Sequence, residues 1–173
     1  LYTSCEGRGL RGPNDLVMDA HGGFYFTDLG KTRHHDMDRG GIYYARCDGS
    51  GIVRVAGPTI TANGCALSPD GRTLYFVETE SCRLWALDIV EPGVVTRTPW
   101  PSPHGGRLVA QVGGAYRRFD SMAVDADGNI CIATLITGAI TIVSPDGTSV
   151  RHVEMPDVYT TNICFGGPDM RTA

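Results

Sequence analysis

The feature that most constrains the fold is an internal repeat, which occurs three times and begins a fourth time near the end of the chain. In each copy an asparagine or aspartate stands eight residues before a glycine, and a short apolar run lies between them. A polar turn contains the glycine, and a second, more apolar run follows it. The three copies are residues 14–22, 63–71 and 120–128. This order of run, turn and run predicts a β-hairpin in each repeat.

Further strand-like runs follow each hairpin. The third runs are residues 41–45, 83–87 and 139–143, and fourth runs are present at 52–55 and 149–153. Four antiparallel strands per repeat are typical of one blade of a β-propeller. The 23 glycines and 10 prolines separate these runs, and no segment keeps a helical period. The sequence therefore predicts an all-β fold.

The spacing of the repeats defines the expected blades. Positions 14, 63, 120 and 162 are separated by 49, 57 and 42 residues, which are usual blade lengths. We expect a single, partial propeller domain over residues 1–173, in which the preceding blade ends at 1–12, blades occupy 13–58, 59–117 and 118–156, and 157–173 start the next blade. These are about three and a half blades, whereas rings have four to eight. We therefore expect the chain to be part of a larger ring, with residues 99–114 as a surface loop.

Composition excludes several classes of partner. The net charge of −4 and the scattered basic residues give no footprint for nucleic acid. The apolar run at residues 130–143 is too short and too polar to cross a membrane. The six cysteines have no C-x-x-C pair, which favours free thiols and a cytoplasmic setting, with Cys65, Cys131 and Cys164 in the core. The oligomeric state stays open.

The first residue of each repeat provides candidate chemistry. Asn14, Asn63 and Asp120 begin the innermost strand of three consecutive blades, so their side chains are expected to converge at the mouth of the central channel. Two carboxamide oxygens and a carboxylate are hard donors that suit calcium or magnesium. The alternative is that these residues form turns and bond only the local backbone.

An ordered series of motifs accompanies these three residues. The motifs are Pro13-Asn14-Asp15, Phe24-Tyr-Phe-Thr-Asp28, Ala62-Asn63-Gly64, Ser68-Pro-Asp-Gly71, Leu74-Tyr-Phe76, Phe119-Asp120-Ser-Met-Ala-Val-Asp125 and Thr161-Asn-Ile-Cys-Phe-Gly-Gly167. The series resembles the gluconolactonase, senescence marker protein and luciferin-regenerating enzyme family over nearly the whole chain. The resemblance implies a six-bladed β-propeller with one divalent metal ion in the channel, typically Ca²⁺, with Zn²⁺, Mg²⁺ and Mn²⁺ as alternatives.

The resemblance also implies roles for individual residues. Asn14, Asn63 and Asp120 correspond to metal ligands of the family, and Asp120 is also the candidate catalytic residue. The acidic ligand from the family's first blade has no counterpart, since Glu6 lies in the expected outer strands of the preceding blade. The family's substrate-contacting arginine sits just before the first asparagine; Gly12 occupies that place here, so the neighbouring Arg11 is carried over as the substrate-binding residue.

The implied activity is hydrolysis of a small sugar-acid lactone such as glucono-1,5-lactone. The metal would polarise the lactone carbonyl, and Asp120 would orient or deprotonate the attacking water. A covalent mechanism has little support, because the sequence lacks the G-x-S-x-G motif of serine hydrolases. Two alternatives remain open: a phosphotriesterase-like or arylesterase-like propeller hydrolase, and a ligand-binding propeller without turnover.

Two acidic residues and a tryptophan have simpler interpretations. Asp28 and Glu78 end the second strands of their repeats, where hydrogen-bonding partners at the rim are more common than catalysts. Trp85 lies in a third strand and is expected to pack between blades.

Overall fold

All the regular secondary structure is β-strand. The computed structural model describes residues 1–169 and 171–173, which contain fifteen strands and no α-helix. The strands are β1 (Ser4–Cys5), β2 (Arg8–Gly9), β3 (Pro13–Met18), β4 (Gly23–Asp28), β5 (Gly40–Arg46), β6 (Ile52–Thr59), β7 (Ala62–Leu67), β8 (Thr73–Glu78), β9 (Arg83–Glu91), β10 (Val94–Thr96), β11 (Arg107–Gln111), β12 (Arg118–Val124), β13 (Ile130–Leu135), β14 (Ala139–Val143) and β15 (Val150–Glu154). The described residues include no helix long and apolar enough to span a membrane.

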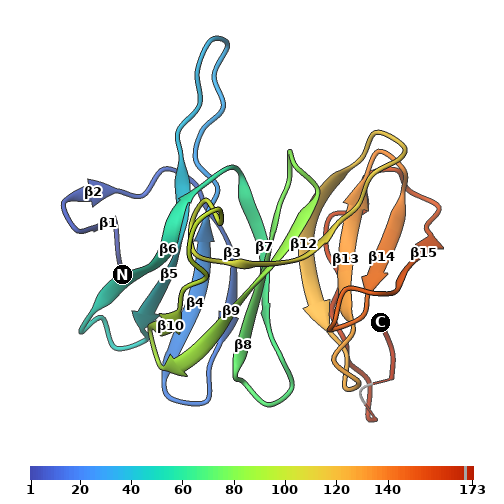
Figure 1. The fold of residues 1–173 in the computed structure, drawn as a ribbon. Helices are drawn as coiled ribbons and strands as arrows, with labels where there is room; N and C mark the ends of the chain where they lie inside the picture. The colour runs from blue at the N-terminus through green and yellow to red at the C-terminus, as the bar shows by residue number, and fades with distance from the viewer. Residues whose placement is uncertain (170) are drawn as a thin grey trace.

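Each repeat forms one antiparallel sheet. The strand orders are β3-β4-β5-β6, then β7-β8-β9-β10 with β11 also on β9, and finally β12-β13-β14-β15. The short β1–β2 hairpin precedes them, and Figure 1 shows the three sheets following one another across the molecule. The first strands lie together, since β7 contacts both β3 and β12. This is the arrangement of consecutive propeller blades, as the repeat predicts.

The hydrophobic core lies between the sheets. One cluster joins the first and second sheets and includes Phe76 and Trp85. Another joins the second and third sheets and includes Tyr75 and Leu84. Neighbouring residues of a strand point to opposite faces, so β8 and β9 contribute to both clusters in alternation. The middle sheet is covered on both faces, which explains why its strands are apolar almost throughout, and Trp85 packs between blades as expected.

The hairpin turns repeat in detail. Gly22, Gly71 and Gly128 occupy the same place in the three turns, with φ values of 78°, 68° and 86°. A residue with a side chain rarely adopts this conformation, whereas glycine does so readily. In the third turn the Asp125 carboxylate accepts hydrogen bonds from the backbone N–H groups of Asp127 and Asn129. The turn is therefore closed by its own aspartate.

Two sequence-based expectations are wrong. Residues 99–114 are not simply a surface loop, because β11 lies within them and pairs with β9, and His104 is buried. The loop folds back on its own sheet, which its Pro and Gly content did not reveal. Cys65 and Cys131 are buried as expected, but Cys164 is exposed. Its neighbours Ile163 and Phe165 pack on the third sheet instead.

Close packing of the first strands explains one glycine. A Cβ atom at Gly64 would lie 2.6 Å from the backbone oxygen of Asp120 and 2.9 Å from the backbone nitrogen of Met122. Backbone atoms of β12 are held by its pairing with β13 and cannot move aside as a flexible side chain can. Gly64 therefore sets how closely β7 approaches β12.

We expect Gly64→Ala to lower the free energy of unfolding by about 1–3 kcal/mol, because the added methyl group forces β7 and β12 apart. Chemical denaturation of the full-length natural protein measures the change. Gly51→Ala is the control, since a Cβ atom there meets no heavy atom within 4 Å, and its effect should stay within about 0.5 kcal/mol. Equal stability of the two variants would contradict the assigned packing.

Candidate metal centre

The first strand of each sheet carries one extra residue at the same place. Between the pairs Pro13–Asp28 and Leu16–Phe26, β3 advances by three residues while β4 advances by two. The same shift follows Ala62 on β7 and Phe119 on β12. These are β-bulges, which redirect side chains and are frequent next to active sites. Asn14, Asn63 and Asp120 are the first residues inside the three bulges.

Asp15 connects the bulges. Its carboxylate accepts a hydrogen bond from the backbone N–H of Cys65 on β7 at 3.3 Å. Burial raises the pKa of the Asp15 carboxyl, while Cys65 on β7 and Ser121 and Met122 on β12 oppose the rise. This carboxylate of the first sheet is therefore bonded to the inner strand of the second sheet and lies near that of the third.

The Asn63 carboxamide is buried and only half satisfied. Its Nδ2 donates to Thr79 Oγ1 at 3.0 Å, and its side chain is among the buried polar groups, with 5% of the residue exposed. Its Oδ1 has no hydrogen-bond partner among the described residues. A buried acceptor without a partner is unfavourable by about 1–3 kcal/mol. This oxygen is therefore available for a ligand.

Asp120 lies beside this carboxamide. Burial raises the pKa of the Asp120 carboxyl, the nearby Asn63 side chain and the backbone N–H of Ser121 lower it, and the charge of Asp15 raises it further. The half-buried Asp120 carboxylate and the unsatisfied Asn63 oxygen are both acceptors, and each is a group that a cation can bind. The donor set is all oxygen, which fits calcium or magnesium.

The structure brings Asn63 and Asp120 together but does not bring Asn14 into contact with them. Asn14 is exposed and borders a hollow of about 280 Å³ with Leu10 and Phe26. Its side chain makes no hydrogen bond to the other two within the described part of the chain. The register alone places Asn14 with them, so its ligand role stays a prediction.

Arg11 lies at the rim of the first sheet. Its backbone N–H donates to the carboxylate of Asp28, as does that of Gly12. The Arg11 side chain borders a hollow of about 450 Å³ together with Arg39 and Asp38. Asp28 is thus a rim hydrogen-bonding partner, as expected, and the substrate role of Arg11 stays a prediction.

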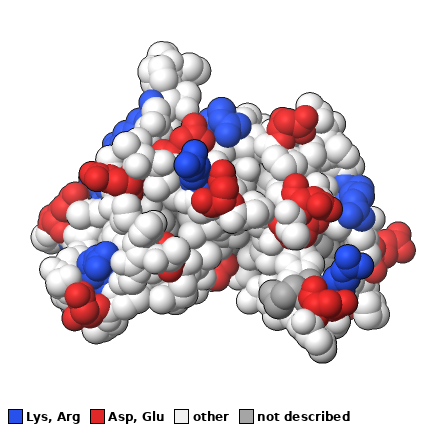
Figure 2. Space-filling view, turned by 90° about the horizontal axis from the view of Figure 1, so that it is seen from below, with Lys and Arg blue, Asp and Glu red and all other residues white. Residues whose placement is uncertain are grey.

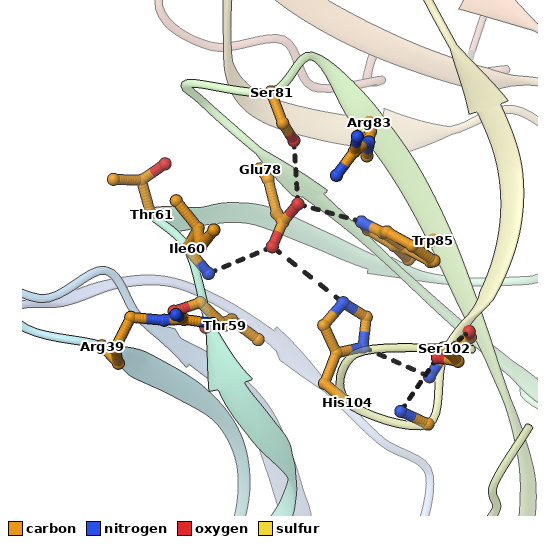
Figure 3. A network of polar contacts seen from close by, with 12 residues as sticks. Arg39, Thr59, Ile60, Thr61, Glu78, Ser81, Arg83, Trp85, Ser102 and His104 are labelled. Atoms are coloured by element: carbon orange, nitrogen blue, oxygen red, sulfur yellow. Dashed lines mark hydrogen bonds and ion pairs between the residues drawn. The ribbon is translucent and has the colours of Figure 1, made fainter. Parts of the chain in front are cut away.

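Glu78 is the matching rim carboxylate of the second sheet (Figure 3). Its Oε1 accepts from the backbone N–H of Ile60 at 3.0 Å, and its Oε2 accepts from Ser81 at 2.8 Å and from Trp85 Nε1 at 3.2 Å. Ile60 precedes β7, so Glu78 fixes the chain as it enters the strand that carries Asn63.

His104 is the buried histidine next to Glu78 in this network. Its Nδ1 accepts from the backbone N–H of Gly106 at 3.2 Å, so in the neutral ring Nε2 carries the proton. Nε2 lies 3.9 Å from Glu78 Oε1 and has no hydrogen-bond partner among residues 1–169 and 171–173. Burial lowers the pKa of His104, while the charge of Glu78 opposes the change.

The charged surface is mixed. Figure 2 shows basic and acidic side chains interspersed over the face that it presents. Several are paired locally, as Arg33 is with Asp36 and Asp38. Within the described residues no three His, Cys, Asp or Glu side chains gather at one place. A metal site at the bulges therefore depends on carboxamide oxygens as well as on carboxylate.

Sequence reasoning missed three residues around this centre. Asp15 is the only acidic residue at the second bulge position, where the other sheets have Gly64 and Ser121. The motif Pro13-Asn14-Asp15 contained that signal. Thr79 and His104 gave no comparable signal, because their contacts depend on strand register and on the course of a long loop.

Comparison with known proteins places these observations in a family. The family model described as the SMP-30/Gluconolactonase/LRE-like region matches residues 1–173. A lactonase drp35 from Staphylococcus saprophyticus subsp. saprophyticus is 33% identical over 144 residues, which are 83% of this chain and 42% of that protein. The chain therefore spans less than half the length of this curated relative.

Solved structures of similar proteins support the same family and fold. A regucalcin from Agrobacterium tumefaciens, described as a calcium-binding protein, has a TM-score of 0.74 and 26% identity over 91% of this chain and 50% of its own. A gluconolactonase from Xanthomonas campestris has a TM-score of 0.73 and 27% identity, covering 95% of this chain and 54% of its own. The resemblance seen in the motifs and the propeller fold are thus confirmed.

The buried His104 predicts a pH dependence of stability. Because its pKa in the folded protein is below the ordinary value of about 6.5, the unfolded chain takes up a proton first as the pH falls. The free energy of unfolding should therefore decrease below pH of about 6.5, by at most about 1.4 kcal/mol per pH unit, until the lowered folded pKa is reached.

His104→Asn removes the titrating group while keeping an acceptor for Gly106. We expect denaturation curves of this variant to lose part of the stability difference between neutral and mildly acidic pH. His21→Asn is the control, since His21 is exposed. If the wild type and His104→Asn showed the same pH dependence, the neutral buried state of His104 would be wrong.

Proposed function

This chain belongs to the SMP-30/gluconolactonase/LRE-like family, and on that premise we propose that it carries part of the active site of a metal-dependent hydrolase of sugar-acid lactones. The observation that carries the proposal is the buried Asn63 Oδ1, which lacks a hydrogen-bond partner in the described structure and belongs to a side chain beside Asp120. The names of the lactonase and gluconolactonase relatives support the substrate class. The calcium-binding description of the regucalcin supports Ca²⁺ as the ion.

Asn63 and Asp120 would hold the cation, and Asn14 would join them from the first bulge. All three offer the oxygen atoms that calcium prefers, and six to eight such ligands including waters are usual. A divalent cation bound there supplies Lewis-acid polarisation of the lactone carbonyl. The remaining ligands would come from water, substrate or residues outside this chain.

Asp120 has the properties of a water-orienting base. Its carboxylate is half-buried, and burial together with the charge of Asp15 raises its pKa. A raised pKa makes the ionised carboxylate a stronger base than that of an exposed aspartate. One carboxylate oxygen can therefore accept a proton from water while the other is bound.

The reaction requires few groups. Water attacks the carbonyl carbon, the ring C–O bond breaks, and the ring oxygen takes a proton to become a hydroxyl group. The product acid releases a proton to solvent at neutral pH. Asp120 accepts the proton of the attacking water and can return it to the leaving oxygen. Arg11, at the rim, is proposed to contact the substrate.

Asp120→Ala should reduce hydrolysis of glucono-1,5-lactone by the full-length natural protein by more than tenfold, because it removes both a ligand and the base. Proton release measured with a pH indicator follows the reaction. Asp127→Ala is a matched control, since Asp127 is exposed in the hairpin turn after β12, and it should retain activity close to that of the wild type.

Removal of the cation by a chelator tests whether the activity depends on the metal. EDTA should abolish the activity, and added Ca²⁺, or one of Zn²⁺, Mg²⁺ and Mn²⁺, should restore it. Activity of Asp120→Ala within tenfold of the wild type would exclude the assigned role of Asp120. Activity that survives EDTA would exclude metal dependence, and a folded, metal-loaded protein without lactonase activity would favour a different ester or a binding role.

A further inference from the structure

One hydroxyl group holds the amide nitrogen of the Asn63 carboxamide. Asn63 Nδ2 donates to Thr79 Oγ1 at 3.0 Å, and the same amide lies near the Asp120 carboxylate and lowers its pKa. Oδ1 is left without a partner. The two ends of a carboxamide have opposite hydrogen-bonding character, so a group that holds Nδ2 also determines where Oδ1 is available.

Thr79 is itself held firmly. It follows β8, and its backbone N–H donates to the carbonyl oxygen of Thr61 at 3.0 Å. The next residue, Glu80, donates its backbone N–H to Thr61 Oγ1 at 3.1 Å. On the other side, Glu78 accepts from the backbone N–H of Ile60. The segment after β8 is therefore fastened to the segment that leads into β7.

This connection continues into the buried network of Figure 3. Trp85 and Ser81 donate to Glu78, and His104 lies beside it. The rings of His104 and Trp85 are 4.5 Å apart at their centroids. The Thr79 hydroxyl therefore projects from a backbone that is fixed on both sides.

The first sheet has no hydroxyl group at the position that corresponds to Thr79. Pairing of Pro13 with Asp28 corresponds to pairing of Ala62 with Glu78, so Leu29 corresponds to Thr79. The backbone N–H of Leu29 donates to the carbonyl oxygen of Gly12 as that of Thr79 does to Thr61. Leucine offers no hydroxyl, and Asn14 is exposed. Of the two asparagines, the buried one has the hydroxyl partner.

We propose that Thr79 is a positioning residue, which holds the amide nitrogen of Asn63 and thereby keeps the carboxamide oxygen available to a divalent cation. The inference rests on the proposed function, because it assigns Asn63 as a ligand. Groups that orient a ligand from behind typically change metal affinity by about 10-fold to 100-fold when they are removed. Thr79 is expected to act on affinity through Asn63, without touching substrate.

The test is the affinity of the full-length natural protein for Ca²⁺ alone, measured by isothermal titration calorimetry. Thr79→Val replaces the hydroxyl by a methyl group of similar size, and it should weaken calcium binding by about 10-fold or more. Thr79→Ser keeps the hydroxyl, and its affinity should stay within about threefold of the wild type. If Thr79→Val does not fold, Thr79→Ala carries the same expectation.

The remaining outcomes overturn the proposal in distinguishable ways. If Asn63→Ala loses calcium binding while Thr79→Val binds as the wild type does, the positioning role is wrong and the metal site stands. If Thr79→Ser is as weak as Thr79→Val, the hydroxyl is not the cause. If calcium binds equally to the wild type, Asn63→Ala and Thr79→Val, both the metal site and the positioning role are wrong.

Discussion

The candidate site depends on one extra residue in the first strand of each sheet. The extra residue interrupts the ladder after Pro13, Ala62 and Phe119. Asp15 lies inside the first bulge and accepts from the backbone N–H of Cys65, the residue that resumes the ladder after the second bulge. The same irregularity therefore places the polar side chains and links the inner strands of the first two sheets.

Packing between sheets gives these bulges their relative positions. Each sheet contributes alternate residues to the cores on its two faces, so Phe76 packs toward the first sheet and Tyr75 toward the third. Interiors of this density do not deform continuously, and the contact of Gly64 with the backbone of Asp120 fixes the approach of the strands. Polar side chains at the starts of these strands are therefore held by a rigid backbone, as the Asn63 carboxamide is held by the Thr79 hydroxyl.

The sequence predicted the features that leave a periodic pattern of residue types and missed those that leave none. Hairpins, turn glycines and the alternation of apolar runs recur, so a period reveals them, and the same period aligned Asn63 with Asp120. The bulges were not evident, because an extra residue leaves a strand-like run looking the same. His104 was missed because a loop rich in Pro and Gly resembles a surface loop, although it returns to cover Glu78 and Trp85.

The central claim is that Asn63 and Asp120 bind one cation at the bulges, and a crystal structure of the full-length natural protein grown with Ca²⁺ tests it most directly. We expect an ion within about 2.3–2.6 Å of Asn63 Oδ1 and of an Asp120 carboxylate oxygen, with Asn63 Nδ2 still donating to Thr79 Oγ1. A bound calcium that contacts neither residue, or an Asn63 carboxamide that turns its nitrogen toward the ion, would contradict it.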